Sequence, residues 1–309
     1  MQDASLQAYS AFRIVLALLV CTSREAIASV VSLDRDVTDV YDIVYSACGT
    51  ARNDEFLLSL KSLQLMALSS PESEHSLYRI HIITDGGFKK DDLQILEKTS
   101  SFLFVLHSPS SMAAPLFAPC STQRLYLHEH PDFDGIDDVV YLDVDTLWID
   151  SMANVKQEFS KMREKQALFG MSVETTFLNG NGSWYKGGYS RSLPYYGEFG
   201  LNAGVLLLSL ERVRATSFSK DRDEIISFYY PKRALPLGDQ DVLNAHAHHH
   251  EEHIHVMSCN FNFRSDTACY DGFPVILHGN RQLREVANSS YSSLYKMFSR
   301  VQLRPAAQS

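Results

Sequence analysis

Two carboxylates, Asp143 and Asp145, stand one residue apart directly after an apolar run. Residues 139–142, Val-Val-Tyr-Leu, are typical of a strand that is buried on both faces of a parallel sheet. Alternation along an extended backbone puts both carboxylates on one side, where they can share a divalent cation such as Mn²⁺ or Mg²⁺. Isolated Asp-x-Asp pairs also occur by chance in solvated turns. The position after a buried strand favours a metal site, because open α/β sheets bind ligands at the carboxyl ends of their strands.

A second apolar run, residues 205–208, follows three small or amide-bearing residues. Such residues leave room for a polyhydroxy ligand to approach the backbone. Residues 238–241, Gly-Asp-Gln-Asp, begin a helical pattern, so free backbone N–H groups and short polar side chains are available to hold sugar hydroxyls. The residues that we expect to bind such a sugar are Asn202, Ala203, Gly204, Asp239 and Gln240.

A third short apolar strand, residues 274–277, ends in residues suited to metal and phosphate binding. The imidazole of His278 is a common metal ligand and can complete the shell of the two aspartates. The guanidinium of Arg281 can form paired hydrogen bonds with phosphate oxygens. A diphosphate beside the metal is therefore expected to meet Gly279, Asn280 and Arg281.

Together these segments resemble the retaining GT-A glycosyltransferases of family 8, the glycogenin-like family, and within it the glucoside xylosyltransferases. The likeness extends over residues 41–298. The Asp-x-Asp pair and residues 202–204 are general to the family, whereas residues 238–241, 259–262 and 278–281 indicate the xylosyl branch. Further matches are Ala47, Cys48 and Gly49 at the end of the first strand, Arg124-Leu125-Tyr126, and Tyr195-Tyr196-Gly197.

The resemblance implies a single α/β domain with the GT-A, Rossmann-like fold: a mostly parallel central sheet flanked by helices. It implies transfer of xylose from UDP-xylose to O-linked glucose on epidermal-growth-factor-like repeats, as on Notch. Mn²⁺, or Mg²⁺, would be held by Asp143, Asp145 and His278. The residues implied to bind the nucleotide and its diphosphate are Ala47, Cys48, Gly49, Arg124, Gly279, Asn280 and Arg281.

Catalytic roles are assigned to two residues of the predicted helix start. Asp239 would hold hydroxyls of the donor sugar, and Gln240 would face the positive charge that develops on the sugar ring. No segment clearly supplies a carboxylate nucleophile, although Asp241 is also close in the sequence. Attack by the acceptor hydroxyl from the same face as the departing phosphate is therefore favoured, with the phosphate oxygen as the base.

Two departures from the family pattern affect these assignments. The wider family usually follows its metal-binding histidine with a spaced glycine and Lys-Pro-Trp, whereas His278 is followed by Gly-Asn-Arg, so Arg281 is assigned to the β-phosphate. Ala203 stands where the xylosyl branch tends to carry Ser, which bears on donor choice. Alternative functions are a family 8 glucosyl- or galactosyltransferase, a metal-dependent nucleotide-sugar hydrolase, and an inactive sugar-binding protein.

Length and composition agree with one large α/β domain. The chain has 309 residues, of which 45% are hydrophobic and 21% charged, and no Gly/Ser-rich or Pro-rich linker divides it. A net charge of −9 argues against nucleic acid as a partner. The expected organisation is a signal-like or anchor segment and leader over residues 1–40, a glycosyltransferase domain over 41–300 and a tail over 301–309.

Strands and helices are expected to alternate, as in parallel β-α-β units. The expected strands are 43–48, 79–84 and 102–106, and the expected helices are 53–68, 91–98 and 122–128, the last carrying Arg124. Residues 175–200 lack a steady period and predict a long functional loop. Its aromatic residues either stack on acceptor sugars or anchor the loop to the core; they are Trp184, Tyr185, Tyr195 and Tyr196.

The chain has five cysteines. The resemblance implies a Cys259–Cys269 disulfide, whose closed loop of about ten residues is worth about 2 to 3 kcal/mol and requires an oxidising compartment. Cys48 is interpreted as a small buried hydrophobe near the nucleotide, and Cys120 has no evident partner.

The amino terminus has features of a secretory signal. About eight apolar residues, 14–21, follow Arg13, and residues 26–28 have the form of a cleavage site. Roughly 20 apolar residues are needed to span a bilayer, so a signal is favoured over an anchor. The expected location is the lumen of the endoplasmic reticulum or Golgi, with membrane anchoring as the alternative. Asn181 and Asn288 begin glycosylation sequons that fit it.

Two polar clusters are interpreted as solvated surface. Histidines at positions 246, 248, 249, 250, 253 and 255 resemble a metal tract, but a solvated helix end is favoured because few of these spacings place two rings on one face. The carboxylates Asp34, Asp36, Asp39 and Asp42 are expected to be exposed before the first strand.

Overall fold

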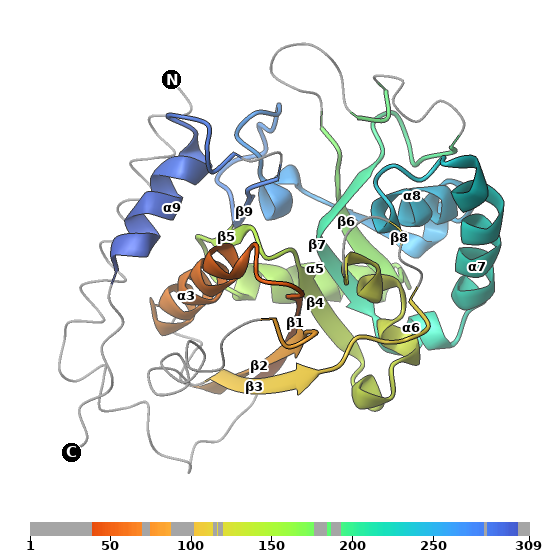
Figure 1. The fold of residues 1–309 in the computed structure, drawn as a ribbon, viewed down its shortest axis with the longest axis horizontal. Helices are drawn as coiled ribbons and strands as arrows, with labels where there is room; N and C mark the ends of the chain where they lie inside the picture. Colours follow the sequence, from red (N-terminus) through yellow and green to blue (C-terminus); the bar gives the residue numbers. More distant parts are fainter. Residues whose placement is uncertain are drawn as a thin grey trace.

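A seven-stranded sheet with strand order β3-β2-β1-β4-β7-β6-β8 forms the centre of the computed structural model (Figure 1). The structure describes residues 39–69, 75–87, 102–113, 116, 120–175, 184–186, 193–280 and 283–301. Among the described strands of this sheet, only β7 runs antiparallel to its neighbours, β4 and β6. The predicted α/β fold with a mostly parallel sheet is confirmed. The strands are β1 (Asp39–Ser46), β2 (Ser76–Ile83), β3 (Phe102–His107), β4 (Asp138–Leu142), β6 (Phe169–Val173), β7 (Leu201–Ser209) and β8 (Ile254–Met257).

Two short strands form a second, antiparallel sheet. β5 (Thr146–Trp148) pairs with β9 (Ile276–His278), so that Thr146 lies opposite His278. Neither strand β5 nor its pairing with β9 was predicted from the sequence, because three residues are too few to show a period. The α-helices are α3 (Asn53–Ser69), α5 (Ala153–Glu164), α6 (Leu210–Arg214), α7 (Phe218–Tyr229), α8 (Asp239–His249) and α9 (Ser290–Arg300).

The sheet separates two hydrophobic clusters. Along β1, Ile43 and Tyr45 belong to one cluster and Val44 to the other, because successive side chains of a strand point to opposite faces. The first cluster contains residues of α3, α5 and α9, and the second contains residues of α6, α7 and α8. In Figure 1, α3 and α9 accordingly lie to one side of the sheet and α7 and α8 to the other.

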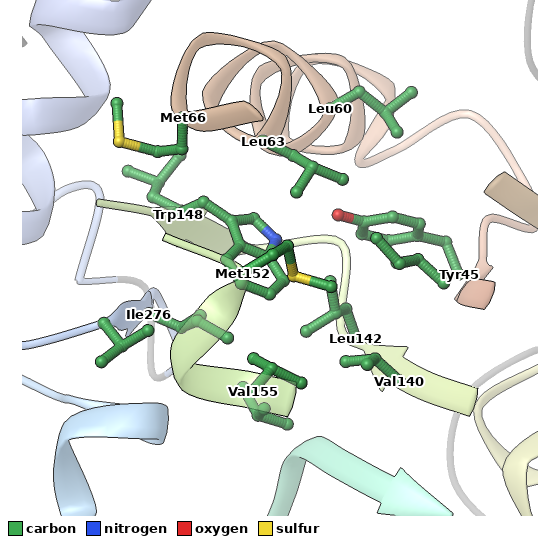
Figure 2. Packing of buried hydrophobic residues seen from close by; sticks show 14 of the residues in the cluster. Tyr45, Leu60, Leu63, Met66, Val140, Leu142, Trp148, Met152, Val155 and Ile276 are labelled. Atoms are coloured by element: carbon green, nitrogen blue, oxygen red, sulfur yellow. The ribbon is translucent and has the colours of Figure 1, made fainter. Parts of the chain in front are cut away.

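Trp148 fixes the second sheet against helix α3. Its ring is fully buried and lies between Leu63 and Met66 of α3 and Ile276 of β9 (Figure 2). Its backbone N–H donates to the Ser62 hydroxyl at 2.9 Å. This packing places β5 and β9, and with them the residues at their ends, beside the end of β4.

Several predicted boundaries differ from the structure. β1 begins at Asp39, four residues earlier than predicted, since the polar start of the strand pairs with β2. The span 122–128 forms short 3₁₀ helices instead of one helix, and Arg124 lies in the first of them, Ser121–Leu125. The predicted helix 91–98, most of the leader and most of the tail lie outside the described residues.

The interpretation of Asp42 as an exposed residue was wrong. Asp42 is buried in β1 and accepts hydrogen bonds from Arg79 at 2.7 Å, and it lies 2.8 Å from the His81 ring nitrogen. Burial raises the pKa of its carboxyl, but these partners outweigh burial and hold the pKa below its usual value. Asp39 pairs with Lys156, and Asp34 and Asp36 lie outside the described residues.

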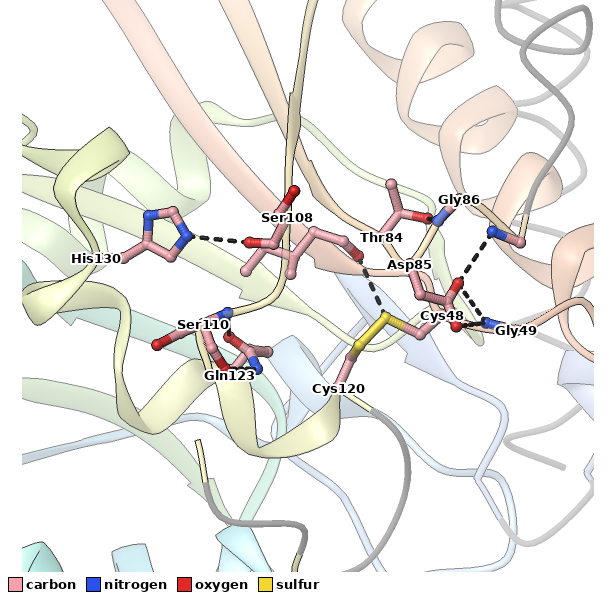
Figure 3. The surroundings of a disulfide bond; sticks show 12 residues. Cys48, Gly49, Thr84, Asp85, Gly86, Ser108, Ser110, Cys120, Gln123 and His130 are labelled. Atoms are coloured by element: carbon pink, nitrogen blue, oxygen red, sulfur yellow. Dashed lines mark hydrogen bonds between the residues drawn. A yellow bond between two sulfur atoms is a disulfide. The ribbon is translucent and has the colours of Figure 1, made fainter. Parts of the chain in front are cut away.

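Two disulfides are present. Cys259 and Cys269 are joined, as the resemblance implied. Cys48 and Cys120 are also joined, so the interpretation of Cys48 as a free buried thiol was wrong and Cys120 has a partner (Figure 3). The two residues are 72 positions apart. They meet because the loop after β1 and the 3₁₀ helix that starts at Ser121 lie at the same edge of the sheet, a contact that spacing alone does not reveal.

Candidate active site

A cavity of about 600 Å³ lies where β1 and β4 end and β7 begins. β7 is antiparallel, so its first residues lie beside the last residues of β4: Leu142 pairs with Val205, and the Asp143 N–H donates to the Gly204 carbonyl at 2.9 Å. The start of α8 and the end of β9 complete the walls. The volume is in the usual range of small-molecule sites.

The two predicted metal ligands of the Asp-x-Asp pair lie in a turn. Asp143 and Asp145 connect β4 to β5, so the extended geometry predicted for them was wrong. The turn nevertheless brings both carboxylates to His278, because β5 pairs with β9. The His278 Nε2 atom is 3.5 Å from Asp143 Oδ2 and 3.4 Å from Asp145 Oδ1.

These three residues fit a divalent cation. Their donor atoms lie within 4.8 Å of one another, and two carboxylates with one imidazole suit Mn²⁺ or Mg²⁺. The His278 Nδ1 atom is 2.8 Å from the Asn262 amide oxygen, which can only accept, so Nδ1 carries the hydrogen and Nε2 is the atom that faces the carboxylates. Burial lowers the pKa of His278, but the two carboxylates have the larger effect and raise the pKa to about 9. A cation therefore has only the Nε2 proton to displace.

Gly204 allows His278 to occupy this position. A Cβ atom at residue 204 would stand 2.1 Å from His278 Cε1. The ring packs against the backbone of β7, and no other residue type leaves that space. Gly204, which was expected to lie near the sugar, therefore also makes room for a predicted metal ligand.

Arg124 lies between two carboxylates. The buried guanidinium donates to Asp143 Oδ1 at 2.6 Å and pairs with Asp239 Oδ2 at 2.8 Å, and it also donates to the Ala203 carbonyl. It stands 4.3 Å from the centre of the Tyr141 ring. Its donors are thus engaged with the protein. In this structure Arg124 lines the cavity and orders the aspartates of the site, and its contact with the nucleotide stays a prediction.

The predicted sugar-binding residues converge on the same wall. Gln240 Oε1 accepts from the Ala203 N–H at 3.1 Å, which joins the start of α8 to β7. The Asn202 amide donates to Glu174 at 2.7 Å, and Glu174 in turn is paired with the buried guanidinium of Arg264. Burial raises the pKa of Asp239.

Asp241 points away from the cavity. It accepts from the Leu237 N–H at 2.6 Å and from the Tyr185 hydroxyl at 2.9 Å, and it is not among the cavity residues. Burial raises its pKa to about 7. Its position anchors the start of α8 and the aromatic loop, and does not suit attack on a bound sugar.

The predicted nucleotide-binding residues lie at the edge of the cavity near β1. Ala47, Cys48, Gly49 and Asn280 all line it. The Gly49 N–H donates to Asp85 (Figure 3). Asn280 Oδ1 is buried and has no hydrogen-bond partner among the described residues, so it is available to a ligand. The Gly279 N–H donates to the Asp145 carbonyl at 2.7 Å, and Arg281 lies outside the described residues.

Arg52 is a site residue that sequence reasoning missed. It precedes α3, lines the cavity and donates to Asp145 Oδ2 at 2.9 Å, while its side chain is 56% exposed. Its position in the sequence could have indicated this role, since Arg52 is the one basic residue between the end of β1 and the start of α3.

The aromatic loop is described only in part, and its residues divide between the two predicted roles. Trp184 lines the cavity. Tyr185 is buried, and its ring stacks on Tyr195 with 5.1 Å between centroids, so these two anchor the loop. Tyr196 packs at the edge of the second cluster.

Among the described residues, no helix is long and apolar enough to cross a membrane. Asn288 is exposed in the turn before α9, with φ of 65°. Asn181 lies outside the described residues.

Known proteins resemble this chain in sequence and in fold. Mouse glucoside xylosyltransferase 2 is 29% identical over 267 residues, which cover 76% of this chain and 56% of the relative. Human glucoside xylosyltransferase 1 is 28% identical over 263 residues, which cover 76% and 56%. The chain thus spans little more than half the length of these relatives. No protein-family model matches it.

Solved structures share the fold at lower identity. Mouse xyloside xylosyltransferase 1 superposes with a TM-score of 0.58 at 18% identity, over 78% of this chain and 98% of that one. The galactosyltransferase LgtC, solved with donor and acceptor sugar analogues, superposes with a TM-score of 0.55 at 18% identity, over 84% and 97%. The chain is a homologue of the glucoside xylosyltransferases, and its fold is the GT-A fold of glycosyltransferases.

Proposed function

We propose that this protein is a retaining glycosyltransferase that moves xylose from UDP-xylose to O-linked glucose on epidermal-growth-factor-like repeats, with Mn²⁺ or Mg²⁺ as cofactor. The observation that carries the proposal is the convergence of Asp143, Asp145 and His278 beside Asp239 and Gln240 in one cavity. The names of the relatives support glucosides as acceptors and xylose as the transferred sugar.

The cation would be held by Asp143, Asp145 and His278, and when bound it neutralises charge on the departing diphosphate. Arg52 adds positive charge beside the proposed metal ligands, because its guanidinium is a partly exposed cation next to Asp145. Asn280 offers its unpartnered amide oxygen as an acceptor for an N–H or O–H group of the nucleotide, and Ala47, Cys48 and Gly49 border the nucleotide. Arg281 retains its assignment to the β-phosphate.

Asp239 and Gln240 hold the donor sugar, with residues 202–204 as its floor. The carboxylates that line the cavity near this floor are already paired: Asp239 with Arg124, and Glu174 with Arg264. Paired carboxylates are weak nucleophiles. This arrangement supports attack by the acceptor hydroxyl on the face from which the phosphate departs, with a phosphate oxygen taking the proton.

The proposed location is the lumen of the secretory pathway. Two disulfides within one chain suit an oxidising compartment. Glycosylation at Asn288 and Asn181 is part of the same proposal. The glycosyltransferase domain is proposed to cover residues 41–300.

UDP-xylose is expected to be the preferred donor. Xylose lacks the hydroxymethyl group of glucose, and a pocket that merely omits contacts with that group discriminates by about 1–3 kcal/mol, whereas steric exclusion discriminates further. We expect kcat/KM for UDP-xylose to exceed that for UDP-glucose by about 10-fold or more. Parallel kinetics with both donors and UDP-galactose on an O-glucosylated repeat measure this. A higher kcat/KM with either hexose donor would leave a family 8 hexosyltransferase, and rapid sugar release without acceptor would indicate a hydrolase.

A further inference from the structure

A second group of metal-ligand side chains lies at the end of α8 that is remote from the cavity. Asp221 of α7 faces His246 and His250, which are four residues apart. Asp221 Oδ2 is 3.5 Å from His246 Nδ1 and 3.3 Å from His250 Nε2. The two imidazole rings stack with 4.6 Å between centroids. Three potential ligand atoms from two helices thus converge within 4.8 Å.

The sequence predicted that His246 belongs to a solvated helix end, and this prediction was wrong. His246 lies inside α8, is 1% exposed and packs edge-on against Phe218 of α7 and Phe169 of β6. A neutral imidazole carries one ring N–H and one nitrogen lone pair, and the lone pair can bind a metal ion.

One ring nitrogen of His246 faces Asp221 without forming a hydrogen bond to any described residue. Its Nε2 atom is 3.0 Å from His253 Nδ1, whereas its buried Nδ1 atom has no hydrogen-bond partner among the described residues. With the hydrogen on Nε2, Nδ1 and the Asp221 carboxylate are two acceptors that face each other. Such an arrangement is unfavourable unless a positive charge lies between them.

The site is also accessible. A hollow of about 280 Å³ is lined by Asp221, His246 and His250, together with Glu224 and His249. The side chains of Asp221 and His250 are 21% and 34% exposed. An ion can reach the buried Nδ1 atom from this side.

We propose that Asp221, His246 and His250 bind a zinc-type divalent transition-metal ion. Two imidazole nitrogens and one carboxylate oxygen form a zinc donor set with a fourth position left open, whereas Mg²⁺ and Ca²⁺ prefer sites in which most of the ligands are oxygen atoms. The ion would join α7 to α8. Because α8 carries Asp239 and Gln240 at its other end, about 16 Å away along the helix, the role is structural support of that helix.

Zinc binding is best measured in an Asp145→Asn background, where the cavity has lost one of its own ligands. Equilibrium dialysis should find one tightly bound Zn²⁺ per chain, and Co²⁺ should give the visible absorption of a low-symmetry site. Asp221→Asn and His250→Gln should each weaken zinc binding by about 10-fold or more. Zn²⁺ should raise the unfolding temperature of the background protein and not of these variants.

His248→Ala is the matched control. His248 lies on the same helix, but it is exposed and its Nδ1 atom donates to the Tyr195 carbonyl, so zinc binding should persist. Glu252→Gln tests the neighbouring group of His250, Glu252 and His253 and should also retain zinc. Unchanged zinc affinity in both Asp221→Asn and His250→Gln, with folding verified by circular dichroism, would overturn the proposal. Absence of bound zinc in the background protein would overturn it as well.

Discussion

Asp145→Asn is expected to lower kcat/KM for xylose transfer by about 10³-fold or more. Burial raises the pKa of Asp145, but His278 and Arg52 outweigh burial and lower it to about 2, so the residue is a carboxylate at all working pH values. The amide keeps the size of the side chain and removes the charge that binds the cation. Loss of about 4 kcal/mol of charge stabilisation at the diphosphate corresponds to that factor. Initial rates at saturating Mn²⁺ measure it.

Asp138→Asn is the control for this variant. It makes the same chemical change at the start of β4, where Asp138 forms a surface ion pair with Arg163 outside the cavity. Activity and unfolding temperature should stay close to the parent values, since exposed ion pairs are worth little. Parent-like activity of Asp145→Asn, after chelation and restoration of Mn²⁺, would contradict the proposed metal site.

Gly204→Ala is expected to lower transfer by about 10²-fold. The added Cβ atom would meet His278 Cε1 at 2.1 Å, so the imidazole must move by about 1 Å or more, and displacements of that size cost about 10²-fold in rate. The KM for Mn²⁺ should rise at the same time, because the displaced ring is one of the proposed ligands. Metal titration of the initial rate separates these effects.

The matched control is Gly170→Ala on the adjacent strand β6. There the added Cβ meets the Met162 sulfur at 2.9 Å, at the far end of a flexible side chain that can yield, and the Leu207 Cβ at 3.1 Å. The Mn²⁺ dependence should remain that of the parent. If Gly204→Ala also retains the parent Mn²⁺ dependence, the position of His278 does not matter for metal binding.

Long apolar segments made much of the fold predictable. Residues 139–142 and 205–208 indicated buried strands, and α3 was predicted nearly to its bounds because its apolar residues continue for four turns. The ends of those segments then indicated where polar residues would meet. That reasoning brought Asp143, Asp145 and His278 to one site even though the predicted extended geometry of the pair was wrong.

Features that depend on distant contacts were not predictable in this way. The Cys48–Cys120 disulfide joins residues 72 apart, and the β5–β9 pairing joins two three-residue strands. The resemblance implied that Arg124 binds the nucleotide, whereas its two carboxylate partners are visible only in the structure. His246 was grouped with the histidines that follow it in the sequence, whereas aromatic residues surround it in space.

The central claim is that this cavity transfers a pentose from UDP-xylose to a glucoside with a divalent cation. It is tested most directly by incubating the protein with UDP-xylose and an O-glucosylated epidermal-growth-factor-like repeat and weighing the repeat by mass spectrometry. We expect the mass to increase by one pentose with Mn²⁺, and to remain unchanged with chelator or without the glucose. No pentose on the glucosylated repeat, from folded protein supplied with Mn²⁺, would contradict the proposed function.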